Sequence, residues 1–195
     1  MLYLTLLSLS AWCHMKLQPA QLLVDHIGMF TAQPLPGPVL DVACGQGHNG
    51  VFVAQQNLPV ICCDKVRKAL DSARQLAKEN GVIVQILQVD LEQEGINPLR
   101  EDLYGGILVF RYLHRPLIPC IRKAIKDGGV LIYETFTVDQ PQFGKPRNPD
   151  FLLQHGELLR WFQDWQVIHF FEGIKEAPTR AVAQIVCRKP PSCRQ

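Results

Sequence analysis

The stretch VLDVACGQGHNG (residues 39–50) restricts the possible folds of this chain more than any other part of the sequence. It opens with an apolar run typical of a strand buried on both faces, and residues 48–57 are predicted to form a helix. Between the two, Gly45, Gly47 and Gly50 match the pattern G-x-G-x-x-G. Glycines in a strand–loop–helix unit let the backbone turn tightly and approach a nucleotide, because no Cβ atom intervenes. The stretch therefore predicts an α/β fold with a nucleotide site.

The rest of the chain continues the alternation of strand and helix. Four further strands are each predicted from a short apolar run, at 58–63, 82–90, 104–110 and 130–136. Helices are predicted at 18–30, 66–80, within 115–129, where glycines end the helix, and within 149–163. The last two strands, 165–171 and 180–189, are close enough to form an antiparallel pair. Together these elements predict a Rossmann-like α/β fold with a seven-stranded, mainly parallel, doubly wound sheet and a C-terminal antiparallel hairpin.

The length and composition are those of one globular domain. The chain has 195 residues, of which 47% are hydrophobic and 19% charged. We expect the domain to span residues 18–195, after an N-terminal extension of residues 1–17. Residues 1–14 include an apolar run, but it has no positively charged start and is short for a membrane span. We therefore expect a cytoplasmic protein without a membrane anchor.

The charges and cysteines narrow the range of partners. The formal net charge is +2, and the Lys and Arg residues are scattered rather than gathered in a basic stripe, which disfavours nucleic-acid binding. The seven cysteines form no C-x-x-C pair, and no Cys/His spacing suits zinc, so we expect no metal site. An odd number of cysteines, with Cys62 and Cys63 in an apolar run, indicates buried free thiols in a reducing compartment.

Asp41, near the end of the first predicted strand, separates two interpretations of the glycine loop. A dinucleotide site places a pyrophosphate at the start of the following helix, where the helix dipole attracts it. A carboxylate at this position would repel that anion, whereas it suits a ligand that carries an ammonium and a sulfonium group. The alternative is that Asp41 only caps the loop.

The sequence D-x-x-C-G-x-G (residues 41–47) resembles motif I of class I S-adenosylmethionine-dependent methyltransferases. The resemblance implies that Asp64, at the end of the second strand, accepts hydrogen bonds from both ribose hydroxyls. It also implies that Asp90, at the end of the third strand, receives the adenine amino group, and that the backbone N–H of Leu91 faces the ring. The same resemblance assigns six further residues to the S-adenosylmethionine site: Asp41, Ala43, Gly45, Gly47, Lys65 and Phe110.

The second half of the chain resembles a small bacterial group of class I methyltransferases related to tellurite-resistance methyltransferases. The segments YLHRPL (112–117), GGVLIYETF (128–136) and 148–159, which contains NPDFLL and GELL, carry this resemblance. That group commonly has Asn where this chain has Arg111. The resemblance implies methyl transfer from S-adenosylmethionine and does not identify the acceptor.

Residues just beyond the fourth strand are candidates for the acceptor pocket, because in this family the end of that strand faces the methyl group. Tyr112 and His114 are the candidate catalytic residues, and a histidine here can remove a proton near neutral pH. Arg115 and Glu134 are the candidate substrate-binding residues. The alternatives are that His114 and Arg115 fix the loop before the next helix, and that Glu134 pairs with Arg115 or Arg111.

The proline-rich loop 137–150 is long for a connection without secondary structure. Such loops are usually functional lids or disordered segments. We expect a lid or an acceptor-binding loop, in which Lys145 and Arg147 meet an anionic acceptor. The alternative for both cations is a solvated surface position.

Two rival functions fit parts of the sequence: a nicotinamide-dependent Rossmann oxidoreductase, and a non-catalytic cofactor-binding protein with a methyltransferase fold. The first would need a substrate domain or a catalytic Tyr/Lys pair, and the sequence contains no Y-x-x-x-K. Asp41, Asp64 and Asp90 end three successive strands and favour a cationic nucleoside ligand over a dinucleotide. The sequence therefore predicts an S-adenosylmethionine-dependent methyltransferase that acts on a small molecule.

Overall fold

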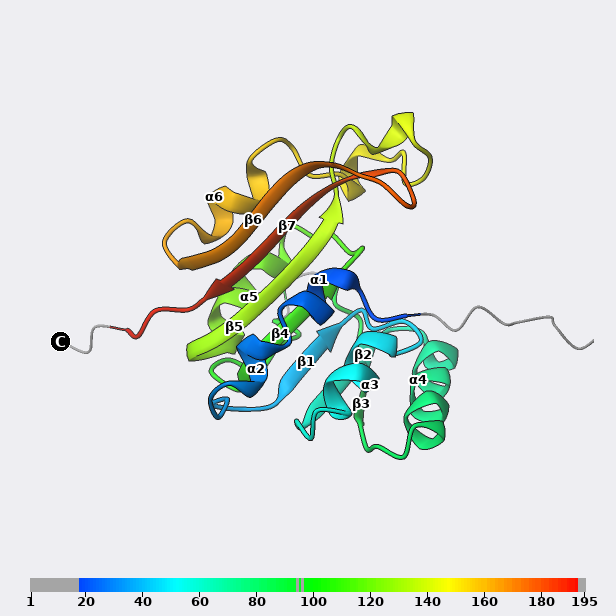
Figure 1. Ribbon diagram of the computed structural model, residues 1–195, viewed down its shortest axis with the longest axis vertical. Coiled ribbons are helices and arrows are strands. Elements are labelled where there is room, and N and C mark those ends of the chain that lie inside the picture. The colour runs from blue at the N-terminus through cyan, green and yellow to red at the C-terminus, as the bar shows by residue number, and fades with distance from the viewer. Residues whose placement is uncertain (1–17, 94, 96, 193–195) are drawn as a thin grey trace, which may run out of the picture.

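A computed structural model describes residues 18–93, 95 and 97–192 of the chain, and its centre is a seven-stranded sheet (Figure 1). The strands are β1 (Val39–Val42), β2 (Val60–Asp64), β3 (Gln85–Gln88), β4 (Tyr104–Phe110), β5 (Ile125–Phe136), β6 (Gln166–Lys175) and β7 (Arg180–Arg188). Their order in the sheet is β3-β2-β1-β4-β5-β7-β6. The first five are parallel, and β7 runs antiparallel to both β5 and β6. The predicted mainly parallel sheet with a C-terminal antiparallel hairpin is confirmed.

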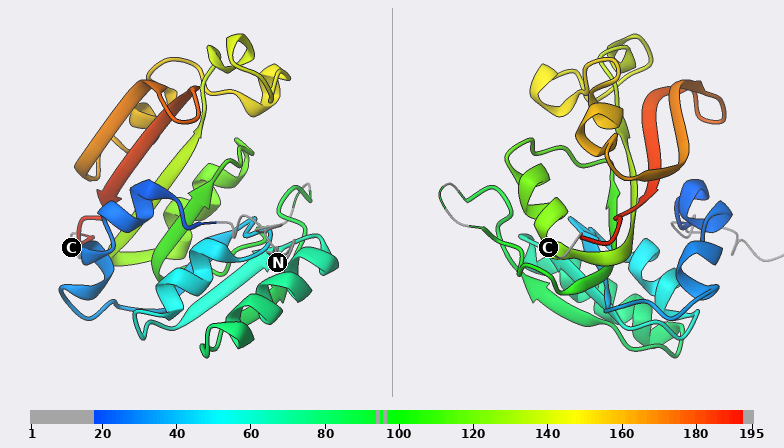
Figure 2. Two further views of the ribbon diagram at one scale, coloured as in Figure 1. Left: turned by 45° about the vertical axis from the view of Figure 1, so that its right-hand side comes forward. Right: turned by 90° about the vertical axis from the view of Figure 1, so that its left-hand side faces the viewer.

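Helices cover both faces of this sheet (Figure 2). One face carries α1 (Gln21–Asp25), α2 (Gly28–Thr31), α3 (His48–Ala54) and α4 (Arg67–Glu79), which share an apolar core with alternate side chains of the strands. The other face carries α5 (Leu117–Ala124) and α6 (Glu157–Phe162), which pack with the remaining strand side chains in a second core. The 3-10 turns η1 (Gln140–Gln142) and η2 (Pro149–Phe151) lie in the segment between β5 and α6. Side chains that alternate between two buried faces explain why the strands read as continuous apolar runs.

The helix predicted over residues 18–30 is wrong in one respect, because the segment folds as two short helices, α1 and α2. The break lies at His26, whose Nδ1 atom is 3.0 Å from the carbonyl oxygen of Leu22. A side chain that bonds this carbonyl competes with the backbone N–H that would continue the helix. The apolar side chains still face the sheet, since Leu22, Leu23 and Phe30 are buried.

The predicted boundary between the helix within 115–129 and the strand 130–136 is also wrong. The helix α5 ends at Ala124, and β5 begins at the next residue, five positions earlier than predicted. Gly128 and Gly129, taken as the end of the helix, lie inside the strand and pair with Lys189 through backbone hydrogen bonds of 2.9 Å. Gly128 has φ +77°, and the register of β4 with β5 shifts between Tyr104 and Gly106. The glycines therefore mark an irregularity in the sheet. In the sequence, glycines at such an irregularity cannot be distinguished from glycines that end a helix.

The predicted N-terminal extension, residues 1–17, lies outside the described residues. Within the described part of the chain, no helix has the length and apolar character needed to span a bilayer.

Candidate functional site

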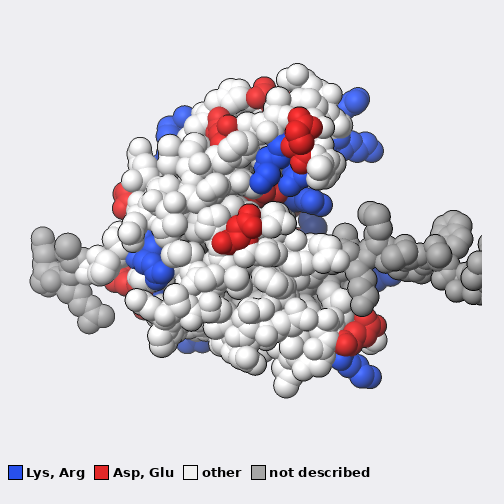
Figure 3. Space-filling model, in the orientation of Figure 1, with Lys and Arg blue, Asp and Glu red and all other residues white. Residues whose placement is uncertain are grey.

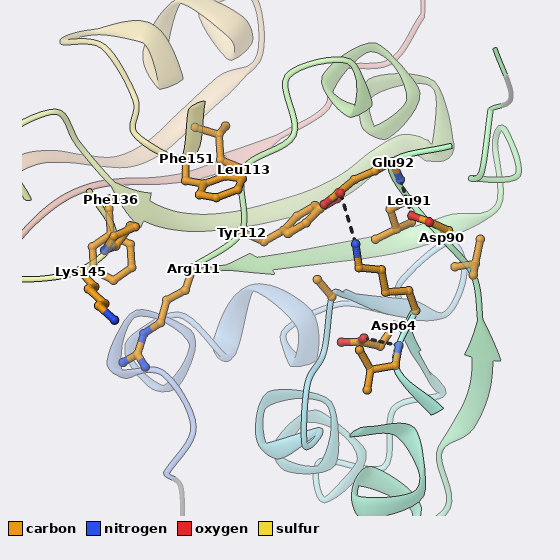
Figure 4. A pocket seen from close by; sticks show the side chains of 15 residues that line it. Asp64, Asp90, Leu91, Glu92, Arg111, Tyr112, Leu113, Phe136, Lys145 and Phe151 are labelled. Atoms are coloured by element: carbon orange, nitrogen blue, oxygen red, sulfur yellow. Dashed lines mark hydrogen bonds and ion pairs between the residues drawn. The ribbon is translucent and has the colours of Figure 1, made fainter. Parts of the chain in front are cut away.

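A cavity of about 610 Å³ opens at the carboxyl ends of the parallel strands (Figure 4). Its lining comes from the segments that follow β1, β2, β3 and β4, from the last residue of β5, and from the loop beyond β5. The lining residues are Ala43, Asp64, Lys65, Val66, Val89, Asp90, Leu91, Glu92, Arg111, Tyr112, Leu113, Phe136, Lys145, Pro146 and Phe151. Ligands of open α/β sheets bind at this edge, and the volume lies in the usual range of about 300–1,000 Å³ for small-molecule sites.

The glycine loop joins β1 to α3 beside this cavity. Gly47 has φ +78°, and a Cβ atom there would lie 2.5 Å from the Cβ of Ala73 in α4. Gly50 packs as closely, because a Cβ atom on it would lie 2.6 Å from the Sγ of Cys62. The loop therefore needs glycine for both its backbone conformation and its close packing on β2 and α4.

Asp41 lies beneath the loop and is 1% exposed. Its Oδ2 accepts a hydrogen bond from the backbone N–H of Gly50 at 2.9 Å, which connects the end of β1 to the first turn of α3. The pKa of Asp41 is raised to about 7, mainly by burial and to a smaller extent by the charge of Asp64, although the hydrogen bond from Gly50 opposes the rise. Asp41 is not among the lining residues, so its predicted contact with the cofactor stays a prediction.

Asp64 ends β2 and lines the cavity, and two backbone groups hold its carboxylate. Oδ2 accepts from the N–H of Gly45 at 3.0 Å, and Oδ1 accepts from the N–H of Val66 at 2.8 Å. Each carboxylate oxygen has a second acceptor direction, so both oxygens can still accept from a ligand. The geometry presents one fixed acceptor pair to the cavity, at the position that the sequence assigned to the ribose.

Asp90 and Leu91 follow β3 and line the same end of the cavity. Asp90 Oδ1 accepts a hydrogen bond from the N–H of Glu92 at 3.0 Å. This bond forms a local turn and fixes the Asp90 carboxylate beside the backbone. Glu92 in turn joins neighbouring elements, because the Nζ of Lys65 is 3.3 Å from its Oε2 and the hydroxyl of Tyr112 donates to its Oε1 at 3.4 Å. This end of the cavity is therefore acidic and hydrogen-bonded.

Tyr112, a predicted catalytic residue, lines the cavity, but its chemistry does not suit a base. Burial raises the pKa of its phenol above the ordinary value, and the charge of Glu92 together with the hydrogen bond to it raises the pKa further. Tyr112 is therefore a hydrogen-bond donor at neutral pH. Its backbone carbonyl accepts from the buried hydroxyl of Tyr133 at 3.0 Å, which fixes the segment after β4.

The other end of the cavity is basic and aromatic. Arg111 follows β4, and Lys145 reaches the cavity from the loop beyond β5. Figure 4 shows their charged ends pointing to the same side of the cavity. Phe136 and Phe151 also line the cavity, and Phe136 lies beside Lys145. Among described residues, neither Arg111 nor Lys145 makes an ion pair or a side-chain hydrogen bond.

The backbone of Arg111 is unusual for a residue with a side chain, since its φ is +55°. Its N–H donates to the carbonyl of Glu134 at 2.9 Å, so the conformation occurs at a fixed point where β4 leaves the sheet. A non-glycine residue in this region costs about 1–2 kcal/mol, and Asn tolerates it better than most. The guanidinium also acts on His48, whose pKa is lowered by burial and by the charge of Arg111.

His114 and Arg115, the other residues predicted beyond β4, are not among the lining residues. Arg115 uses its guanidinium within the protein, with Nε and Nη2 donating to the two carboxylate oxygens of Glu157 at 2.7 and 2.9 Å. It also donates to the backbone carbonyls of Asp150 and Leu152 at 3.0 and 2.9 Å. This geometry favours the alternative that Arg115 fixes a loop. A role for His114 as a base stays a prediction.

Glu134, the other predicted substrate-binding residue, is 4% exposed within the sheet and is also absent from the lining. It accepts a hydrogen bond from the side chain of Gln184, and its Oε1 is 3.8 Å from the Nη2 of Arg180. The pairing proposed from sequence, with Arg115 or Arg111, is therefore wrong. Both partners of Glu134 come from β7, which lies beside β5 in the sheet.

Of the remaining predicted residues, Ala43 and Lys65 line the cavity, whereas Gly45, Gly47, Phe110 and Arg147 do not. Several lining residues were not predicted from the sequence, namely Val66, Val89, Glu92, Leu113, Phe136, Pro146 and Phe151, and Arg111 was considered only as a partner of Glu134. Val66, Val89, Glu92 and Leu113 lie within four residues after the end of a strand, so the topology could have indicated them. Phe151 had no such signal.

The amino-acid sequence matches the family model described as "Tellurite resistance protein TehB" over residues 26–181. The chain belongs to the TehB family. A curated relative, "Probable S-adenosyl-L-methionine-dependent methyltransferase TehB" of Haemophilus influenzae, is 24% identical over 146 residues, which cover 72% of this chain and 50% of the relative. The "tRNA 5-carboxymethoxyuridine methyltransferase" of Escherichia coli is 22% identical over 156 residues, covering 67% of this chain and 60% of that protein.

The solved structure of TehB from Haemophilus influenzae is similar in fold, with a TM-score of 0.69 and 19% identity over 86% of this chain and 61% of that one. The chain spans about half the length of the curated TehB relatives that it matches. The predicted resemblance to tellurite-resistance methyltransferases and the predicted fold class are confirmed. Membership of the TehB family makes S-adenosylmethionine the cofactor to which the site must be compared.

Proposed function

We propose that this protein binds S-adenosylmethionine in the cavity and transfers its methyl group to a small acceptor. The observation that carries the proposal is Asp64, whose carboxylate is fixed by the N–H groups of Gly45 and Val66 and faces the cavity. A carboxylate held in this way is an acceptor pair for two neighbouring hydroxyls. Asp90 and Leu91, at the end of the next strand, would hold the base beside the sugar.

The residues fit a cationic nucleoside better than a dinucleotide. Asp64 and Asp90 line the cavity, and Asp41 lies under the loop where a pyrophosphate would sit in a dinucleotide site. The two carboxylates that line the cavity, Asp64 and Asp90, would repel a pyrophosphate and favour a ligand with positive charge. This charge pattern disfavours the rival function of a nicotinamide-dependent oxidoreductase.

When bound, S-adenosylmethionine supplies a methyl group that is already activated on a sulfonium. The task left to the protein is to hold the acceptor in line and to exclude water. Correct positioning can lower a barrier by about 7–11 kcal/mol. Phe136, Leu113 and Phe151 supply the apolar walls that exclude water. The hydroxyl of Tyr112 donates its hydrogen bond to Glu92, so its oxygen can accept a hydrogen bond from a ligand.

The charges on one face of the molecule, the face seen in Figure 3, favour a small acceptor over a nucleic acid. Figure 3 shows Lys and Arg side chains in separate groups on that face, with Asp and Glu among them and large uncharged areas between. Nucleic-acid sites usually need a continuous basic surface. We also infer that the protein works in a reducing compartment such as the cytoplasm, because the five cysteines in the described residues are free thiols.

Release of S-adenosylhomocysteine from S-adenosylmethionine tests the proposal. The full chain is incubated with a panel of small acceptors that includes thiols, carboxylic acids and tellurite. We expect release that depends on one acceptor class, that is lost in Asp64→Ala, and that persists in Asp71→Ala, which removes an exposed carboxylate of α4. Cofactor binding without release for any acceptor would instead favour the non-catalytic rival.

A further inference from the structure

The cavity separates its charges into two ends. Asp64, Asp90 and Glu92 line the end formed after β2 and β3, and the only cation there, Lys65, pairs with Glu92 at 3.3 Å. Among the lining residues described, Arg111 and Lys145 are the other two cations. A ligand that fills the whole cavity therefore meets carboxylates at one end and two cations at the other.

Within the described part of the chain, the two cations have no side-chain partner. Neither Arg111 nor Lys145 forms an ion pair with another described residue, although most other arginines and lysines near this edge, such as Arg115 and Arg180, face carboxylates. Two like charges directed at one side of a cavity repel each other unless an anion lies between them. The pair is therefore complementary to an anionic group of a ligand.

The backbone of Arg111 adds a second observation. Arg111 has a backbone φ of +55°, a conformation that glycine and asparagine adopt with less strain than arginine. Strained residues concentrate at ligand sites, where the side chain has a use that offsets the strain. The side chain of Arg111 lines the cavity and makes no ion pair or side-chain hydrogen bond with a described residue, so its charged end is available to a ligand.

The walls beside the two cations are apolar. Leu113, Phe136, Pro146 and Phe151 line this end, and Figure 4 shows Phe136 beside Lys145 and Phe151 beside Leu113. A small, fully hydrated anion would make few favourable contacts with apolar walls of this kind. They are complementary to an apolar body that carries the charge at one end.

We propose that the methyl acceptor is an organic carboxylate with an aromatic or aliphatic body, whose charge Arg111 and Lys145 bind together. This inference rests on the proposed function. Arg111 offers its planar guanidinium for two parallel hydrogen bonds to one carboxylate, and Lys145 adds a point charge. The body of the acceptor packs on Phe136 and Phe151 and is thereby held next to the nucleoside end.

S-adenosylmethionine has a carboxylate of its own, which is a competing partner for one of the two cations. The two possibilities differ in their effect on affinity. If Arg111 and Lys145 serve the acceptor, neutralising them weakens acceptor binding and leaves the dissociation constant of S-adenosylhomocysteine within about twofold. If they serve the cofactor, neutralising them weakens S-adenosylhomocysteine binding and leaves acceptor binding within about twofold.

Ligand-observed NMR on the full chain saturated with S-adenosylhomocysteine tests the inference, after calorimetry has established that this ligand binds. The probes are aryl and alkyl carboxylates, including benzoate, phenylacetate and hexanoate, each measured beside its neutral amide and beside selenite as a compact inorganic anion. We expect at least one carboxylate to bind at least tenfold more tightly than its amide and than selenite. Arg111→Gln and Lys145→Gln should each weaken that carboxylate about tenfold, and Lys78→Gln, an exposed change on α4, should not.

Three results would overturn the inference. They are equal binding of carboxylate and amide, tighter binding of selenite than of every carboxylate, and loss of S-adenosylhomocysteine affinity in Arg111→Gln with carboxylate binding unchanged. Absence of binding by the whole carboxylate panel to the loaded protein also counts against it. Failure of S-adenosylhomocysteine itself to bind would instead contradict the proposed function, so the two failures are distinguishable.

Discussion

The carboxylate of Asp41 accepts a hydrogen bond from the backbone N–H of Gly50 at 2.9 Å, inside the turn that carries the glycine loop. The contact is tight, because a Cβ atom on Gly50 would lie 3.1 Å from the Oδ2 of Asp41. One buried side chain thus fixes the end of β1 to the start of α3. The buried carboxyl of Asp41 loses its contact with water, and this burial raises its pKa to about 7.

Asp41 should make the stability of the protein fall as pH rises. Its pKa is about 7 when folded and 3.8 as a free group, so the unfolded chain releases this proton first. The protonated form stabilises the fold below about pH 4, and this stabilisation is lost between about pH 4 and 7, by up to about 4 kcal/mol. Asp41→Asn keeps an acceptor for Gly50 without the charge, so urea unfolding should show a smaller decline across this range than in the wild type.

The control for that experiment is Asp71→Asn, which removes an exposed carboxylate on α4. It should follow the wild-type pH dependence. If the stability of Asp41→Asn declines as steeply as that of the wild type from about pH 4 to 7, Asp41 does not titrate as its burial requires.

The contact between Gly47 and Ala73 predicts a compensating pair of substitutions. Gly47→Ala places a Cβ atom 2.5 Å from that of Ala73 and puts alanine at φ +78°, so we expect a loss of about 2–4 kcal/mol. Ala73→Gly alone should cost about 1 kcal/mol as a glycine within a helix. In the double variant the clash is relieved, so its loss of stability should be at least about 1 kcal/mol smaller than the sum of the losses in the two single variants. Urea unfolding of the four proteins measures this, and strict additivity would show that the loop does not pack on α4 as described.

The bidentate pair of Arg115 with Glu157 predicts a pH-dependent contribution to folding. Burial alone would raise the pKa of Glu157, but the hydrogen bonds from Arg115 and from the N–H of Gln154 hold it below the ordinary value. A lowered pKa stabilises the fold above about pH 4.5 and loses that effect as the pH falls through the folded value. The Arg115 side chain is 36% exposed, so solvent screens the pair. Arg115→Ala should cost about 1–2 kcal/mol at pH 7 and less at pH 3.5, as judged by urea unfolding.

The same variant distinguishes a positioning role from a substrate contact. Arg115→Ala should leave the dissociation constant of S-adenosylhomocysteine unchanged, because Arg115 is not among the residues that line the cavity. Equal stability of variant and wild type at pH 7, with acceptor turnover lost, would return Arg115 to the substrate site.

The strained backbone of Arg111 predicts that stability and ligand binding change in opposite directions. Arg111→Asn places at φ +55° a residue that tolerates this conformation, so we expect a gain of about 0.5–1 kcal/mol in the free energy of unfolding. Arg111→Gln removes the same charge without easing the backbone and should give no such gain. Urea unfolding compares the two, and a gain in both would assign the effect to charge rather than to strain.

The parts of the fold and site that are predictable from sequence are those set by a single strand and its end. Asp64, Asp90 and Leu91 were predicted and do line the cavity, because an apolar run marks where each strand stops. The carboxyl ends of parallel strands meet at one edge of a sheet, so such residues converge without further information.

The basic and aromatic end of the cavity depends on contacts that no local sequence pattern encodes. Phe151 joins Phe136 there only because the loop beyond β5 folds back over the sheet, with the N–H of Leu153 donating to the carbonyl of Phe136 at 2.9 Å. Similarly, Arg115 is placed by Glu157, a residue far along the chain. Gly128 misled the sequence interpretation because a positive φ serves a strand irregularity and a helix end equally well.

Calorimetric titration of the full chain with S-adenosylhomocysteine, and separately with NAD, distinguishes a methyltransferase site from a dinucleotide site. We expect one bound S-adenosylhomocysteine per chain and no binding of NAD. We also expect Asp64→Ala to weaken S-adenosylhomocysteine binding by about 1–3 kcal/mol, or about 5- to 150-fold, and Asp71→Ala to leave it unchanged. Binding of NAD without S-adenosylhomocysteine, or an Asp64→Ala variant with unchanged affinity, would contradict the proposed cofactor site.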